Sequence, residues 1–243
     1  MSLQFSDSAT KRGIVELIDS TCKTNSTSYP LVEKTRDINL TLDRAIAIAL
    51  KACGTWQFDD SNHLGYPIIT TDIVAGQRDY SFVNDNAGNL ILDIYKVFVK
   101  DPVSGIYNEI KPVDVNSETG TEGFTDGQDI QGKVHRYDKM ANGIFLDSIP
   151  DTNVANGLKM YINREALYFT TADTTKKSGI DGRLHEYLSA RPSYMYAMRN
   201  SLANVVALEK EMLKWEQEIL DTYGMREKDK RKIIKAKQTR NYI

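Results

Sequence analysis

Residues 89–100 read NLILDIYKVFVK, a run in which isoleucine, valine and aromatic residues predominate. Such residues favour a β-strand, because branched and aromatic side chains fit a pleated, half-buried surface. The run ends at DPVSG (residues 101–105), whose aspartate, proline, serine and glycine are typical of turns. The stretch therefore predicts a strand followed by a turn, and the same pattern recurs on both sides of it.

The neighbouring runs of this kind predict further strands. They are PIITTDIV (67–74), RDYSF (78–82), IYNEIKPV (106–113), KVHRYD (133–138), IFLD (144–147) and LKMYINREALYF (158–169). Asn142-Gly143 is a strong signal for a two-residue hairpin. Residues 114–132 are polar and rich in glycine, and they predict a long loop of the kind that contacts partners. We expect residues 55–170 to form an antiparallel β domain, either a small sandwich or an open barrel.

Helical spacing marks the chain before residue 55. Thr10–Cys22 predicts a first helix, and a second is expected from Pro30 to about Cys53, with Gly54 where helices commonly end. The apolar residues of the second helix recur at the spacing of one helix face. They are Ile38, Leu42, Ala45, Ile46, Ala49 and Cys53.

Helices are expected again after residue 182. The segment RLHEYLSA (183–190) predicts a short helix that Pro192 interrupts, and Ser193 to about Tyr223 predicts one long helix of roughly 45 Å. That length exceeds what a small core needs, so we expect part of this helix to pack against another chain or against the Pro30–Cys53 helix. The residues expected at this oligomer interface keep steps of three and four: Met198, Leu202, Val205, Met212, Trp215 and Ile219.

Together these patterns predict an α+β fold in which a helical bundle carries an inserted β domain. The expected domains are N-terminal helices (1–54), the β domain (55–170), C-terminal helices (183–224) and a basic C-terminal extension (225–243). The net charge also differs between these parts of the chain: it is about +1 for residues 1–54, −8 for residues 55–182 and +5 for residues 183–243. Such asymmetry indicates an interacting terminus.

The composition is that of a soluble globular protein, with 41% hydrophobic and 26% charged residues in 243. No apolar run approaches the roughly 20 residues that cross a bilayer, and the N-terminus lacks the apolar core of a signal peptide. Cys22 and Cys53 are too few for a disulfide scaffold and are expected to be buried thiols, which fits synthesis in a reducing cytoplasm.

The sequence offers no pattern for catalysis. His63 lies close to Asp59 and Asp60, but nothing further along the chain completes a metal site. His135 and His185 stand alone, and no phosphate-binding loop or nucleophile motif is present. We therefore expect no enzymatic activity, no metal and no cofactor.

The basic C-terminus is the most suggestive local feature. Eight lysine and arginine residues lie between Arg226 and Arg240, against two acidic residues. The segment is either a solvated tail or a docking element for an acidic protein surface or a nucleic acid backbone. Ile233 and Ile234 within the run favour a protein partner, because a segment that binds only phosphates has no use for paired apolar residues.

The order of parts and several phrases resemble the head-to-tail adaptor proteins of tailed bacteriophages, also called connector or neck ring proteins, especially those of short-tailed phages. The phrases are INLTLDRAIAIAL (38–50), WQFDDSNHLGYPIITTDIVAGQRDYSF (56–82), GIFLDSIPDTNVANGLKMYINREALYF (143–169) and EYLSARPSYMYAM (186–198). The resemblance covers nearly the whole chain, but these motifs are architectural. The longer loop at 114–132 departs from the best-known members.

The resemblance implies a ring, commonly dodecameric, that binds beneath the portal protein in the neck of the virion, with no membrane involved. Genomic DNA would pass through the ring without specific binding, and the next tail or nozzle protein would attach to it. Portal docking would fall on the C-terminal segment. Its candidate residues are Arg226, Lys228, Lys230, Arg231, Lys232, Ile233, Ile234, Lys235, Lys237 and Arg240. The alternatives are another virion ring or minor tail protein, and a nucleic-acid-binding accessory protein that uses the basic tail.

Overall fold

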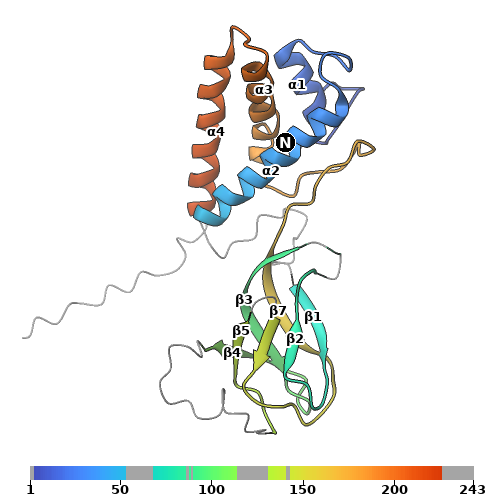
Figure 1. Ribbon diagram of the computed structural model, residues 1–243, viewed down its shortest axis with the longest axis vertical. Helices are drawn as coiled ribbons and strands as arrows, with labels where there is room; N and C mark the ends of the chain where they lie inside the picture. Colours follow the sequence, from blue (N-terminus) through green and yellow to red (C-terminus); the bar gives the residue numbers. More distant parts are fainter. Residues whose placement is uncertain are drawn as a thin grey trace, which may run out of the picture.

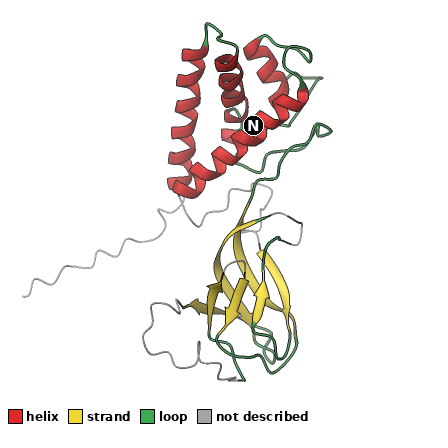
Figure 2. Cartoon of the chain, viewed as in Figure 1, coloured by secondary structure: helices red, strands yellow, loops and turns green. Residues whose placement is uncertain are grey.

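The computed structural model describes residues 3–52, 68–85, 88, 90–113, 131–140 and 143–225. Within these residues, helices gather in one part of the molecule and strands form one curled sheet in the other (Figure 1). The helices belong to both ends of the chain, whereas the strands belong to its middle (Figure 2).

Four α-helices and a short 3₁₀ turn occur in the described residues. They are α1 (Ile14–Cys22), α2 (Leu31–Ala52), η1 (Gly182–Leu184), α3 (Tyr187–Arg199) and α4 (Val205–Met225). The second predicted helix is confirmed, and the apolar face expected on it is buried from Ile38 to Ala49. The first begins four residues later than predicted. The chain before it folds back over Gly13, where a Cβ would lie only 2.3 Å from the Asp7 nitrogen.

Seven strands form a single sheet in the order β1-β7-β3-β4-β5-β6-β2. Their bounds are β1 (Ile68–Ile73), β2 (Asp79–Ser81), β3 (Ile91–Lys100), β4 (Tyr107–Pro112), β5 (Arg136–Met140), β6 (Gly143–Leu146) and β7 (Val154–Arg164). The predicted hairpin is confirmed, since β5 and β6 pair antiparallel with Met140 opposite Gly143. β4 and β5 pair in parallel instead, which the long connection between them permits.

The predicted fold class was wrong. The fold is mixed α/β: a curled sheet of seven strands accompanied by four helices in the described residues, with strands outnumbering helices. It is not a helical bundle with a long C-terminal helix that carries a purely antiparallel β domain. The parallel pairing of β4 with β5 makes the sheet mixed. The domain boundaries drawn from the sequence stay a prediction.

The long C-terminal helix is absent because the chain turns between α3 and α4. Ser201 takes a left-handed conformation with φ of 52°, and the Leu202 nitrogen bonds back to the Ala197 carbonyl at 2.9 Å. Asparagine and serine favour such turns, since their side chains compete for backbone hydrogen bonds. The break expected at Pro192 was also wrong. The α3 helix continues through Pro192, which is itself buried in the helical part, so packing outweighs the backbone hydrogen bond that the proline removes.

Two hydrophobic cores hold the described residues. The helical core combines residues between Phe5 and Ala49 with residues between Ala166 and Tyr223, so the two ends of the chain bury one another. The sheet core draws only on residues between Ile69 and Ile162. None of the described helices is both long and apolar enough to cross a membrane.

Candidate interaction surfaces

The outward face of α4 carries large apolar side chains that the core does not use. Val206 is 58% exposed and Leu213 is 53% exposed. They lie seven residues apart, which is two turns, so they share one face of the helix. Met198, at the end of α3, is 54% exposed. Apolar side chains displayed in a row on a helix are candidates for contact with another protein chain.

The oligomer residues predicted from the sequence lie differently. Ile219 is buried in the helical core, and Met212 and Trp215 are half-buried against it. Leu202 lies in the turn between the helices and Val205 begins α4, both half-exposed. Of the six, Met198 alone is largely exposed. The structure therefore does not bring these residues together on one outer face.

Sequence reasoning missed Val206 and Leu213 because it followed the strongest apolar stripe of the helix. In a globular protein such a stripe faces the protein's own core, and it does so here at Leu208 and Ile219. The signal that could have identified them was their own spacing of seven residues, which forms a second, weaker apolar pair on the helix face rich in Glu and Lys.

A groove of about 370 Å³ lies between α2 and α4, with Leu213 on its wall. Across it, the Arg44 guanidinium binds the Glu216 carboxylate through two hydrogen bonds of 3.1 and 2.9 Å. The Tyr187 hydroxyl also donates to Glu216, at 3.0 Å. The hydrogen bond from Arg44 lowers the pKa of Glu216 despite partial burial. This ion pair fixes the α4 helix against α2, and it therefore fixes the direction in which Leu213 points.

A buried carboxylate fixes the other end of the helical part. Asp37 of α2 is fully buried and accepts hydrogen bonds from Arg199 at the end of α3, from the Tyr29 hydroxyl and from Arg36. Burial acts to raise the pKa of Asp37, but the hydrogen bonds from Arg199 and Tyr29 outweigh it, so the pKa is lowered. We interpret this cluster as a structural lock between α2 and α3.

His185 is fully buried and joins the start of the described chain, at Leu3, to residues 178–180. The Leu3 backbone N–H donates to His185 Nδ1 at 2.8 Å, while Nε2 lies 2.9 Å from the Ile180 carbonyl and 3.0 Å from Ser178 Oγ. This contact holds the N-terminus beside the segment that enters α3. His135 is exposed on the sheet, and the site suggested around His63 lies outside the described residues.

No group of three or more histidine, cysteine, aspartate or glutamate residues is placed to hold a metal in the part of the chain that the structure describes. Cys22 is buried, and burial raises the pKa of its thiol. Cys53 lies outside the described residues, as do all ten residues predicted to dock on the portal and nearly all of the predicted 114–132 loop.

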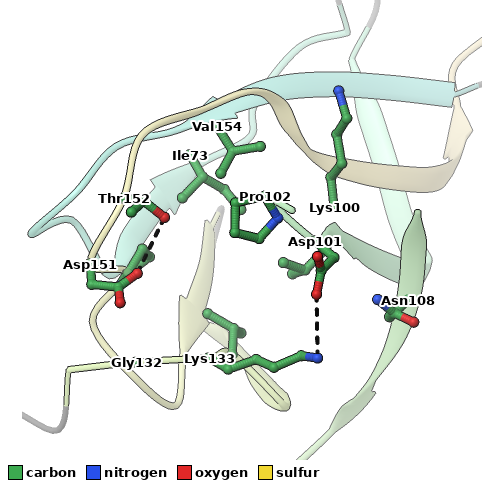
Figure 3. A pocket seen from close by; sticks show the side chains of 13 residues that line it. Ile73, Lys100, Asp101, Pro102, Asn108, Gly132, Lys133, Asp151, Thr152 and Val154 are labelled. Carbon is green, nitrogen blue, oxygen red and sulfur yellow. Dashed lines mark hydrogen bonds and ion pairs between the residues drawn. The ribbon is translucent and has the colours of Figure 1, made fainter. Parts of the chain in front are cut away.

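A hollow of about 200 Å³ opens in the sheet part (Figure 3). Its apolar lining comes from Ile73, Val99, Pro102, Val134, Pro150 and Val154. Polar groups stand around it, among them Lys133, which lies 3.6 Å from the Asp101 carboxylate. An apolar hollow with few polar groups is suited to an aliphatic side chain rather than to a charged ligand.

Comparison of the chain with models of known protein families found no match, and comparison with curated proteins found none either.

Proposed function

We propose that the chain is a structural protein of a tailed bacteriophage, a head-to-tail adaptor that forms a ring beneath the portal and links capsid to tail. The genome passes through this ring without specific binding. The protein acts by oligomerisation and docking rather than by catalysis, without a cofactor, and its place is the neck of the virion after synthesis in the host cytoplasm. The sequence resemblance gives this proposal its class.

The observation that carries the proposal is the apolar outward face of α4. Val206 and Leu213 stay exposed although the helical core beneath them is complete. Leaving such side chains in water loses about 1.5 to 3 kcal/mol each relative to burial. The Arg44–Glu216 ion pair joins α4 to α2 and so helps to keep this apolar face in one position. A surface of this kind suits a permanent contact with another chain.

A ring contact joins two different surfaces of neighbouring copies. The helical part offers a second exposed apolar pair, Val32 and Leu40 on α2, with exposed fractions of 68% and 46%. We infer that the α4 face of one copy packs on the α2 face of the next. The two pairs belong to different helices, so the contact does not pair a surface with itself and can repeat around a ring.

The basic segment gives the proposed ring its attachment to the portal. It follows directly after Met225, where α4 ends, and holds eight cationic residues together with Ile233 and Ile234. Cationic residues around an apolar pair suit a mixed acidic and apolar surface on a protein. The end of the ring that faces the phage tail would bind the next tail or nozzle protein.

The test uses the full chain and the portal protein of the phage that encodes it, observed together by electron microscopy. We expect rings on the portal with the wild-type chain, and loss of rings with Leu213→Asp. The matched control is Val83→Asp, which places the same charge at an exposed valine of the sheet part. Rings that survive Leu213→Asp unchanged would contradict the α4 contact.

Removal of residues 226–243 tests the docking step separately. We expect the shortened chain to fold, as judged by circular dichroism, and to lose portal binding. Normal docking of the shortened chain would overturn the role of the tail. Binding of duplex DNA that weakens steeply with salt, together with no binding to the portal, would favour the nucleic-acid-binding alternative instead.

A further inference from the structure

The turn between β3 and β4 presents two aliphatic side chains to solvent. Val103 is 95% exposed and Ile106 is 63% exposed. The turn is closed by backbone hydrogen bonds of 2.9 Å from Gly105 to Asp101 and from Asp101 to Ile106. Gly105 has a φ of 69°, a conformation that suits glycine. We call residues 101–106 the β3–β4 tip.

The Asp101 carboxylate makes this tip rigid. Its Oδ1 atom accepts hydrogen bonds from the backbone nitrogens of Val103 at 3.0 Å and Ser104 at 2.8 Å. These hydrogen bonds lower the pKa of Asp101. A side chain held in one place loses little conformational freedom when it binds, which favours binding. Val103 is thus a pre-organised apolar knob.

The hollow of Figure 3 lies directly beside the tip. Pro102 lines the hollow and is the residue before Val103, and the Lys133–Asp101 ion pair crosses between the two features. An apolar knob and an apolar hollow therefore belong to one continuous surface. The charged residues that line the hollow are balanced in sign: Lys100 and Lys133 against Asp101 and Asp151.

This surface lies at the end of the sheet that points away from the helices. Val154, where β7 begins, lines the hollow, while the other end of β7 at Arg164 leads to Phe169. There the Asn39 side chain of α2 accepts a hydrogen bond from the Phe169 backbone N–H and donates one to the Phe169 carbonyl, both at 2.9 Å. No described helix covers the tip, and the surface is separate from the α2 and α4 faces (Figure 1).

We propose that this end of the sheet binds a second copy of the chain, with Val103 of each copy entering the hollow of the other. A two-fold contact requires a self-complementary patch. A knob and a hollow side by side, with equal numbers of positive and negative groups around them, meet that requirement. The dimer is independent of the proposed ring, because it uses neither α2 nor α4.

The contact is small, so we expect a weak dimer with a dissociation constant on the order of micromolar. Sedimentation velocity on the full chain over a range of concentrations measures it. We expect Val103→Asp to weaken dimerisation by at least about a hundredfold, since the two-fold contact loses two buried valines at once. The matched control Val83→Asp changes an exposed valine of the sheet part that belongs to neither proposed contact, and it should leave this dimer intact.

A second pair of variants tests the geometry without relying on Val103→Asp. Thr152 is exposed and lines the hollow, so Thr152→Trp should fill it and also abolish the dimer. Mixed samples of Val103→Cys and Thr152→Cys should form a disulfide-linked heterodimer under mild oxidation, whereas Val83→Cys with Thr152→Cys should not. A wild-type chain that stays monomeric up to its solubility limit would overturn the proposal. A dimer that both Val103→Asp and Thr152→Trp leave unchanged would do so as well.

Discussion

The helical part and the sheet part are stabilised in different ways. Of the polar residues that are buried in the described chain, the sheet part holds only Ser148 and Asn163, while the helical part holds Lys34, Thr35, Asp37, Thr41, Ser178, His185 and Ser193. The sheet core is otherwise made of aliphatic and aromatic side chains. The helical part thus relies on specific polar contacts where the sheet part relies on packing.

The difference follows from how the chain supplies each part. The sheet is built from one continuous stretch of the chain, in which the alternation of side chains sets the faces of the strands, although β7 pairs with the distant β1 and β3 and β6 pairs with the distant β2. The helical part joins segments more than a hundred residues apart, such as Asn39 with Phe169 and Leu3 with His185. Buried hydrogen bonds of this kind fix which surfaces meet, because a wrong pairing leaves them unsatisfied.

The largest effect should come from the sheet core. Leu158 of β7 is fully buried, and Leu158→Ala removes its side chain from the strand that pairs with both β1 and β3. We expect a loss of about 3 kcal/mol in the free energy of unfolding, the middle of the range for buried leucines. Urea unfolding followed by circular dichroism measures it. A loss below about 1 kcal/mol would mean that the sheet does not depend on packing in this way.

The Asp37 lock should come next. Asp37→Asn removes the charge that pairs with Arg199 at the end of α3. We expect a loss of about 2 to 3 kcal/mol in the free energy of unfolding, reduced from the fully buried case because Arg199 is 37% exposed. The matched control in the sheet part is Asp93→Asn, whose ion pair with Lys139 at 3.0 Å is exposed on both sides. Asp93→Asn should lower the free energy of unfolding by less than about 1 kcal/mol. Equal losses for the two variants would remove the contrast between the parts.

Lowering the pH should reveal the same difference between the helical part and the sheet part, with a smaller loss of stability. The pKa of Asp37 in the folded chain lies below its ordinary value of 3.8, and that of Glu216 lies below its ordinary value of 4.5. Each carboxylate therefore stabilises the fold above its ordinary pKa, and this contribution is lost as the pH falls through the folded pKa. We expect the urea midpoint to fall below about pH 4.5. The fall should be smaller in Asp37→Asn, and an identical fall in both proteins would contradict the role of Asp37.

Much of the secondary structure could be predicted, because it depends on local patterns. The run at 89–100 became β3, the Asn142-Gly143 signal marked the β5–β6 hairpin, and the apolar face of α2 lies in the core. Each of these follows from residues close together in the chain. The break between α3 and α4 was missed, since apolar spacing continues across Asn200 and Ser201 and outweighed their preference for turns.

The candidate surfaces could be predicted only in part. The sequence indicated that the C-terminal helical region is longer than a small core needs. It placed Ile219 at an oligomer interface, whereas that residue lies in the core of the chain itself. A helix pattern shows how many apolar faces exist, and it does not show which of them the rest of the chain covers. The β3–β4 tip was visible as DPVSG, yet nothing local revealed that a hollow lies beside it.

By itself, then, the sequence determined the strands, the α2 helix and the basic terminus, since all of these follow from neighbouring residues. Tertiary structure decided the parallel pairing of β4 with β5, the burial of Ile219, the exposure of Val206 and Leu213, and the position of the β3–β4 tip beside a hollow. The physical reason is that burial is a property of what packs over a residue, and that neighbour is supplied by chain far away in sequence.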